Sequence, residues 1–166
     1  MTSNKMYCLP DGWTSPDEAT AELVSEMIGK VPQGEFQVVT RSENGQPSVI
    51  ENAPFFYDGT PMPTRYWLVD PALVADISRL ESGGAITRVQ DEIDIDEIQS
   101  IHERHKIERD LLILDSYEGP RPTGGVGGTR KGVKCLHTHV ANYLASGDDK
   151  VGEWALTEIE KIKANQ

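Results

Sequence analysis

The chain has 166 residues, of which 37% are hydrophobic and 26% charged, a composition typical of one folded domain rather than of a disordered chain. Its formal net charge of -11 argues against broad binding to nucleic acids or anionic membranes, because both require a positive field over much of the surface. The N-terminus lacks the apolar core of a signal peptide and no apolar run approaches the roughly 20 residues of a membrane span, so we expect a cytoplasmic protein whose two cysteines, Cys8 and Cys135, are reduced.

The first part of the chain predicts a tail followed by a helix. We expect residues 1–14 to form a flexible N-terminal tail and residues 15–166 to form a single domain. The sequence Ser15-Pro-Asp-Glu18 is typical of a helix start, with the serine as N-cap, the proline in the first helical position and the glutamate three residues after the cap. Gly29 predicts the end of this helix.

The next part of the chain predicts a small antiparallel sheet. Three segments have strand composition, at residues 36–40, 48–51 and 64–69. Turns are predicted at Asn44-Gly45 and at Asp58-Gly59, and a fourth short extended piece at residues 55–57. We therefore expect a three-stranded antiparallel sheet.

After the sheet the hydrophobic pattern acquires the period of a helix. Helices are expected at residues 70–83, 94–114 and 135–145, and from residue 148 or 149 onward. The order of helix, strands and then helices indicates an α+β fold in one domain, with an N-terminal helix and about four C-terminal helices.

The segment from Gly119 to Gly147 contains no Asp or Glu, although the whole chain is acidic. Glycine lets backbone N–H groups approach a ligand closely, and a helix that starts after the loop would add further free N–H donors. We predict a cradle here for a phosphate or another small anion, formed by Arg121, Gly124, Gly125, Gly127, Gly128, Arg130, Lys131 and Lys134. The known phosphate-loop patterns are not matched, and a solvated surface loop is the alternative.

Cys135, His137 and His139 follow this loop and invite a metal interpretation. On a helix, the two histidines flank the apolar stripe on opposite sides, so they do not easily share one ion and we expect no metal site. Cys135 lies at a helix start beside Lys134, which would favour its thiolate and make it a nucleophile. The alternative is a small buried thiol that packs at the base of the loop.

The inward face of the long predicted helix carries polar residues. His102, His105 and Arg109 share this face with isoleucine and leucine side chains, whereas Glu103, Lys106 and Asp110 point elsewhere. The three inward groups either satisfy core carbonyls or line a pocket under the glycine-rich loop. A histidine there could also act as an acid or base.

Five segments occur in a characteristic order, namely 58–71, 78–81 (SRLE), 108–110 (ERD), Gly127-Gly128 and 133–137 (VKCLH). Together they resemble a bacterial domain-of-unknown-function family, number five hundred and one. The resemblance covers about residues 22–155. It implies a small cytoplasmic protein of uncharacterised biochemistry, whose gene often lies near those of an exopolyphosphatase-type phosphatase and a small septum-formation protein.

The resemblance also suggests which positions matter. The family signature corresponds to Gly127, Gly128, Val133, Lys134, Cys135, Leu136 and His137, and His102 and Arg109 match further positions of the pattern. The chain departs from the family in its polar tail, which contains Cys8, and at Val69-Asp70, where a Thr-Cys pair often precedes the proline.

Three functions remain open from the sequence. The first is binding of a small phosphate-type anion at the basic loop, with His102, Arg109 and His137 closing the site. The second is an enzyme that uses Cys135 as nucleophile and His137 or His102 as base. The third is a protein-interaction module whose basic loop grips an acidic partner.

Overall fold

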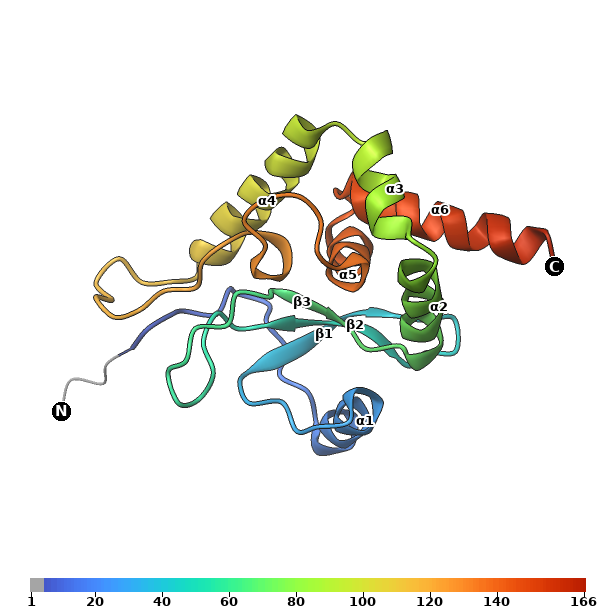
Figure 1. Ribbon diagram of the computed structural model, residues 1–166. Helices are drawn as coiled ribbons and strands as arrows, with labels where there is room; N and C mark the ends of the chain where they lie inside the picture. Colours follow the sequence, from blue (N-terminus) through green and yellow to red (C-terminus); the bar gives the residue numbers. More distant parts are fainter. Residues whose placement is uncertain (1–4) are drawn as a thin grey trace.

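The computed structural model describes residues 5–166, and residues 1–4 lie outside the described part (Figure 1). The elements in chain order are α1 (Glu18–Ile28), β1 (Phe36–Arg41), β2 (Pro47–Asn52), β3 (Tyr66–Leu68), α2 (Pro71–Ser82), α3 (Ala85–Glu92), α4 (Ile95–Asp110), the 3₁₀ turn η1 (Val126–Gly128), α5 (Leu136–Ser146) and α6 (Lys150–Ala164). This order confirms the α+β prediction.

The strands form one antiparallel sheet in the order β1-β2-β3, as predicted. Val38 of β1 pairs with Ile50 of β2, and Ile50 pairs in turn with Trp67 of β3. Gly45 forms the hairpin turn with a φ of 83°, a conformation that glycine adopts without steric cost. The expected extended piece at 55–57 is reduced to one isolated bridge between Phe55 and Pro61.

Helices cover both faces of the sheet (Figure 1). On one face, Val24 of α1 packs with Ile50 and with Trp67. On the other face, Ala141 of α5 packs with Val49. Because neighbouring residues of β2 point to opposite faces, Val49 and Ile50 together connect the two layers.

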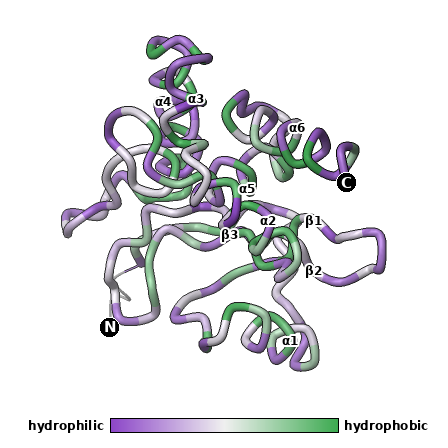
Figure 2. The backbone as a smooth tube through the Cα atoms, turned by 45° about the vertical axis from the view of Figure 1, so that its right-hand side comes forward, coloured by the Kyte–Doolittle hydropathy of each residue, from purple (hydrophilic) through white to green (hydrophobic). Residues whose placement is uncertain are grey.

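The largest core lies away from the sheet, between α2, α3, α4, α5 and α6. Its buried members include Ile77, Val89, Ile101, Val140 and Val151, one from each helix. In Figure 2, α6 alternates between green and purple along its length, as expected of a helix that buries one side and exposes the other. Among residues 5–166, no helix is both long enough and apolar enough to span a bilayer.

Two helix boundaries differ from the sequence prediction. The N-cap of α1 is Asp17 instead of Ser15, because the Asp17 carboxylate accepts a hydrogen bond from the Thr20 N–H at 2.8 Å. The long helix α4 ends at Asp110 instead of Leu114. Here the N-terminal segment intervenes, since Cys8 N–H donates to Leu112 O at 2.8 Å and Leu114 N–H donates to Met6 O at 3.0 Å.

This pairing holds part of the predicted N-terminal tail against the domain. Tyr7 forms an isolated antiparallel bridge with Ile113, and its ring stacks on Phe55 with centroids 6.1 Å apart. Residues 6–8 are therefore held against the domain, whereas the part of the predicted tail at residues 1–4 lies outside the described residues.

Five α-helices follow the sheet, one more than the four named from the sequence. The additional helix, α3, is short and starts directly after Gly84, and it buries only Ala85 and Val89. A two-turn helix with two buried residues has too few repeats to produce a recognisable period.

Candidate functional site

The glycine-rich loop lies beside α4, and Arg109 of α4 holds it there. The Arg109 side chain is 1% exposed, and its guanidinium donates hydrogen bonds to the carbonyls of Pro63, Pro122 and Gly124 at 3.1, 3.4 and 2.9 Å. Its Nε contacts the Asp110 carboxylate at 3.0 Å. Arg109 therefore holds the backbone of the loop against α4, and its side chain is buried beneath the loop.

His102 fixes the same loop at two further points. Its Nδ1 accepts a hydrogen bond from the Val126 N–H at 3.1 Å, and its Nε2–H donates to Gly132 O at 2.7 Å. Burial lowers the pKa of His102, although the bond to Gly132 opposes this shift. A neutral ring with its proton on Nε2 satisfies both contacts.

The loop approaches α4 very closely at Gly125. A Cβ at Gly125 would overlap the Cβ of His102, which no side chain tolerates. The loop also uses its own amides, since Gly125 N–H donates to Thr129 O and Gly128 N–H donates to Gly125 O. Close packing against α4 and a tight internal turn thus account for these two glycines.

A groove of about 540 Å³ opens between α4 and the loop. Three cationic side chains line it, Lys106 of α4 and Arg121 and Arg130 of the loop, together with the acids Glu103 and Asp110. The other lining residues are Gln99, His102, Pro122, Thr123, Gly124 and Gly125. Positive side chains from two separate segments of the chain therefore meet at one concave surface.

The backbone around the groove is held in place. Arg121 donates hydrogen bonds to Leu114 O at 3.0 Å and to Tyr117 O at 2.7 Å. Gln99 of α4 donates to the carbonyl of Arg130 at 3.2 Å. The Arg121 side chain and the Arg130 backbone are consequently held in place, one before and one after the turn η1.

The remaining candidates lie on the other side of the loop, where α5 begins against α2. Cys135 is the N-cap residue of α5, and its Sγ lies 3.6 Å from His137 Nδ1. The same Nδ1 lies 3.2 Å from Oε1 of Glu81, which α2 supplies. The other ring nitrogen, Nε2, lies 3.2 Å from Val74 O and 3.1 Å from Ser78 Oγ.

The thiol and the imidazole of this cluster shift each other's pKa. Burial by itself would raise the pKa of Cys135, but hydrogen bonds with His137 and with the Thr138 backbone lower it below its ordinary value. The hydrogen bond with Cys135 raises the pKa of His137, against the effect of burial. Glu81 of α2 is the carboxylate partner of His137.

Glu81 also occupies the helix start that the sequence suggested for an external anion. Its Oε2 accepts a hydrogen bond from the Leu136 N–H at 2.8 Å, at the N-terminus of α5. A carboxylate of the protein itself thus takes the favourable position for negative charge. Lys131 and Lys134 are exposed and do not line the groove.

A buried polar network links α4, α5 and the start of α6. His139 Nδ1–H donates to Asp149 Oδ2 at 2.8 Å, and the Asn142 amide donates to the same oxygen at 3.0 Å. His105 Nδ1–H donates to Asn142 Oδ1 at 3.2 Å. His137 and His139 therefore contact different parts of the molecule.

Eight of the twelve predicted site residues fall into two places. His102, Arg121, Gly124, Gly125 and Arg130 line the groove, with Arg109 behind it, whereas Cys135 and His137 form the cluster with Glu81. Gly127 and Gly128 belong to the turn η1 and to neither place. Sequence reasoning did not predict Lys106 as a site residue, because the period of α4 indicates only that this side chain is exposed. The available signal was its position four residues after His102, on the same side of the helix.

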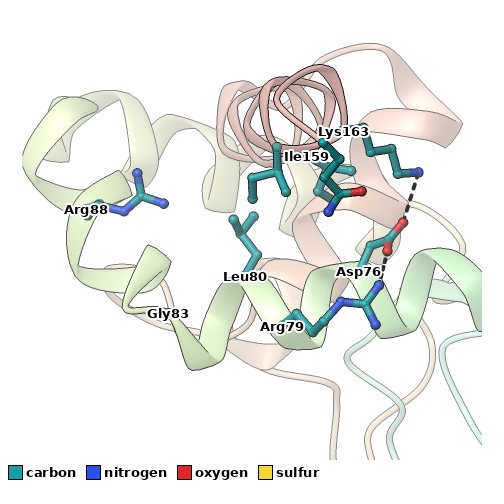
Figure 3. A pocket seen from close by; sticks show the side chains of 9 residues that line it. Asp76, Arg79, Leu80, Gly83, Arg88, Ile159 and Lys163 are labelled. Carbon is teal, nitrogen blue, oxygen red and sulfur yellow. Dashed lines mark hydrogen bonds and ion pairs between the residues drawn. The ribbon is translucent and has the colours of Figure 1, made fainter.

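A further depression of about 420 Å³ lies between α2, α3 and α6 (Figure 3). Leu80 and Ile159 form its apolar part. Asp76 pairs with Arg79 on the same helix and with Lys163 of α6, as the dashed lines in Figure 3 show. Arg88 pairs with Glu158, so each of the three cationic side chains that line this depression already has a carboxylate partner.

The fold and the site together define an α+β domain with a basic groove and a separate thiol–imidazole–carboxylate cluster. The family described as Protein of unknown function (DUF501) matches residues 38–157, more than half of the chain, and the protein belongs to this family. The resemblance stated from the sequence is thereby confirmed. No curated protein and no solved structure matches the chain.

Proposed function

We propose that the protein binds a small phosphate-type anion in the groove between α4 and the glycine-rich loop. The observation that carries the proposal is the meeting of Lys106, Arg121 and Arg130 at one concave surface of an otherwise acidic chain. Local positive charge in a concave site concentrates anions there, while the negative charge elsewhere repels polyanions with extended surfaces.

The charges of the groove support an anion more than a cation. Of its two acids, Asp110 is already paired with the guanidinium of the buried Arg109. Lys106 and Arg130 are exposed, and no ion pair involves either of them within residues 5–166. Two cations are thus available for a ligand, with Arg121 as a third whose guanidinium is oriented by backbone carbonyls.

The size of the groove indicates the class of ligand. A volume of about 540 Å³ lies within the range of ordinary small-molecule sites. Cations on both sides of the groove suit a ligand with several linked negative groups, such as a phosphorylated metabolite, a nucleotide or a short polyphosphate.

A thermal-shift titration tests this proposal. The full chain is titrated with pyrophosphate and tripolyphosphate at constant ionic strength, with sodium chloride as reference. Saturating ligand, at about 100 times its dissociation constant, stabilises the folded state by about 2.7 kcal/mol. For a chain of this length, that corresponds to a rise in melting temperature of roughly 5–10 °C.

The matched control variants come from the same loop as Arg130. Lys106→Ala and Arg130→Ala should each reduce the shift strongly, whereas Lys131→Ala and Lys134→Ala, which remove equal charge outside the groove, should retain it. A shift that is equal in all four variants, or one reproduced by sodium chloride, would refute the proposal.

A further inference from the structure

We propose that Glu81, Cys135 and His137 form a binding site for one Zn²⁺ ion, with three protein ligands and a fourth position open to solvent. One donor atom of each residue lies within 4.8 Å of the others. The site lies between α2 and the start of α5 and shares no residue with the anion groove, so it is independent of the proposed function.

The orientation of the His137 ring is that of a metal ligand. Nε2–H donates to the backbone carbonyl of Val74 at 3.2 Å, so the ring keeps this proton, and loss of the other proton on zinc binding leaves the lone pair on Nδ1. Nδ1 faces Cys135 Sγ and Glu81 Oε1. Metal-binding histidines commonly donate their second ring N–H to a backbone carbonyl, which fixes both the tautomer and the ring orientation.

The distances between the donor atoms agree with a tetrahedral ion. In a tetrahedral zinc site, a thiolate sulfur and an imidazole nitrogen lie about 3.5 Å apart, and an imidazole nitrogen and a carboxylate oxygen about 3.4 Å apart. The corresponding distances here are 3.6 Å from Cys135 Sγ to His137 Nδ1 and 3.2 Å from His137 Nδ1 to Glu81 Oε1. Two of the three distances therefore match a tetrahedral site, and the Cys135 sulfur and a Glu81 carboxylate oxygen lie within 4.8 Å of each other.

Glu81 is held in position for the same role. Its Oε2 accepts the Leu136 N–H at 2.8 Å, so Oε1 is directed toward the histidine as a single ligand atom. This hydrogen bond also ties the carboxylate of α2 to the first turn of α5. The ion would thus join two helices whose contact already depends on Glu81.

The chemistry of the set matches zinc. Thiolate, imidazole and carboxylate are all zinc ligands, and one thiolate with one carboxylate balances the charge of a divalent ion. Binding forms the Sγ–Zn bond and breaks the S–H bond of Cys135, and the proton passes to the solvent. All three residues are partly exposed, which leaves room for water at the fourth position.

The first experiment measures stoichiometry. The full chain is treated with a chelator, dialysed and titrated with zinc chloride by calorimetry, with the bound metal counted by elemental analysis. One equivalent is expected, and Co²⁺ in its place should show the absorption of a cobalt–thiolate bond. Circular dichroism confirms the fold of every protein compared.

The variants assign the ligands. Cys135→Ser, His137→Gln and Glu81→Gln should each weaken zinc binding at least tenfold. The Glu81→Gln variant keeps a side-chain oxygen that can still accept the hydrogen bond from Leu136, so the contact between the two helices is retained. Cys8→Ser removes the other thiol, which is exposed, and should bind as the wild type does.

Alkylation of the wild-type chain supplies an internal control. One equivalent of Zn²⁺ should slow the labelling of Cys135 by iodoacetamide at least tenfold and leave that of Cys8 unchanged, as measured by mass spectrometry of the peptides. Absence of stoichiometric binding, binding unaffected by the three substitutions, or equal labelling of Cys135 with and without Zn²⁺ would overturn the proposal.

Discussion

At the scale of single residues, Arg109 shows how a buried charge can organise a loop. The guanidinium is almost completely removed from water, and it is compensated by three backbone carbonyls and by Asp110. A buried charge with full hydrogen bonding is stable, whereas removing it leaves its partners unsatisfied. The loop that forms one wall of the groove therefore depends on a residue that does not line the groove.

We expect Arg109→Ala to lower the free energy of unfolding by about 3 kcal/mol or more, because three carbonyls lose a charged donor and a cavity remains. Urea denaturation followed by circular dichroism measures the change. Arg104→Ala is the control, since Arg104 pairs with Asp148 on the surface, where an ion pair contributes less than about 1 kcal/mol. Equal effects of the two substitutions would contradict the structural role of Arg109.

At the scale of elements, α5 and α6 approach each other closely at Gly152. A Cβ at this position would overlap the carbonyl oxygen of His139 and lie 2.7 Å from Tyr143 Cβ. Gly152 lies inside α6 in ordinary helical geometry, so its backbone conformation does not require glycine. Glycine is required because a larger side chain would collide with the neighbouring helix α5. The contact also brings the Asp149 N-cap of α6 to His139.

We expect Gly152→Ala to destabilise the protein by about 1–3 kcal/mol, although alanine is the better helix former, because the added methyl group pushes α6 away from α5. Gly83→Ala is a suitable control, since its φ is -86° and the nearest atom would lie at an ordinary contact distance of 3.5 Å. The urea midpoints of both variants measure the difference. A neutral or stabilising effect at Gly152 would show that the two helices separate without cost.

The whole molecule carries a buried histidine at the junction of its layers. His105 donates to Asn142 and packs edge-on to Tyr66 of the sheet. Burial lowers the pKa of His105 from 6.5 to about 4, and the charges of Arg109 and Arg65 add to this effect, while Asn142 and Asp149 oppose it. The folded state therefore holds this imidazole neutral through the mildly acidic range.

The buried His105 makes the stability of the protein depend on pH. Below about pH 6.5 the unfolded chain binds a proton at His105, whereas the folded chain does so only near pH 4, so acid favours unfolding. We expect this group to remove about 2 kcal/mol of stability between pH 7 and pH 5. His105→Gln should flatten the plot of unfolding free energy against pH, whatever its own stability. An unchanged slope would contradict the assignment.

The prediction of the fold rested on local signals that the structure retains. Asp70 caps α2 through the Ala72 and Leu73 N–H groups, and Gly45 forms the hairpin turn, because caps and turns depend on a few adjacent residues. The predicted end of α4 was wrong, because residues 112–114 pair with residues 6–8 instead of forming the last helical turn. No local pattern contains that information.

The site divides in the same way. The loop cations were readable from composition, and the groove lies where the loop meets α4. Of the predicted inward face only His102 lines it, whereas Glu103, Lys106 and Asp110, which were expected to point elsewhere, do line it. Other features of the site depend on how α2, α4 and α5 are packed. This packing decides that Lys106 lines the groove, that Lys131 and Lys134 do not, and that Glu81 contacts His137.

The amino-acid sequence by itself determined the order of the helices and strands, the residues that form the turns and the concentration of positive charge in one loop of an acidic chain. Each of these depends on residues close together along the backbone. Only the tertiary structure decided which charges share a surface and which side chains meet Cys135. Those contacts join segments far apart in the chain, such as Glu81 and Cys135, and their geometry follows from the packing of the whole core.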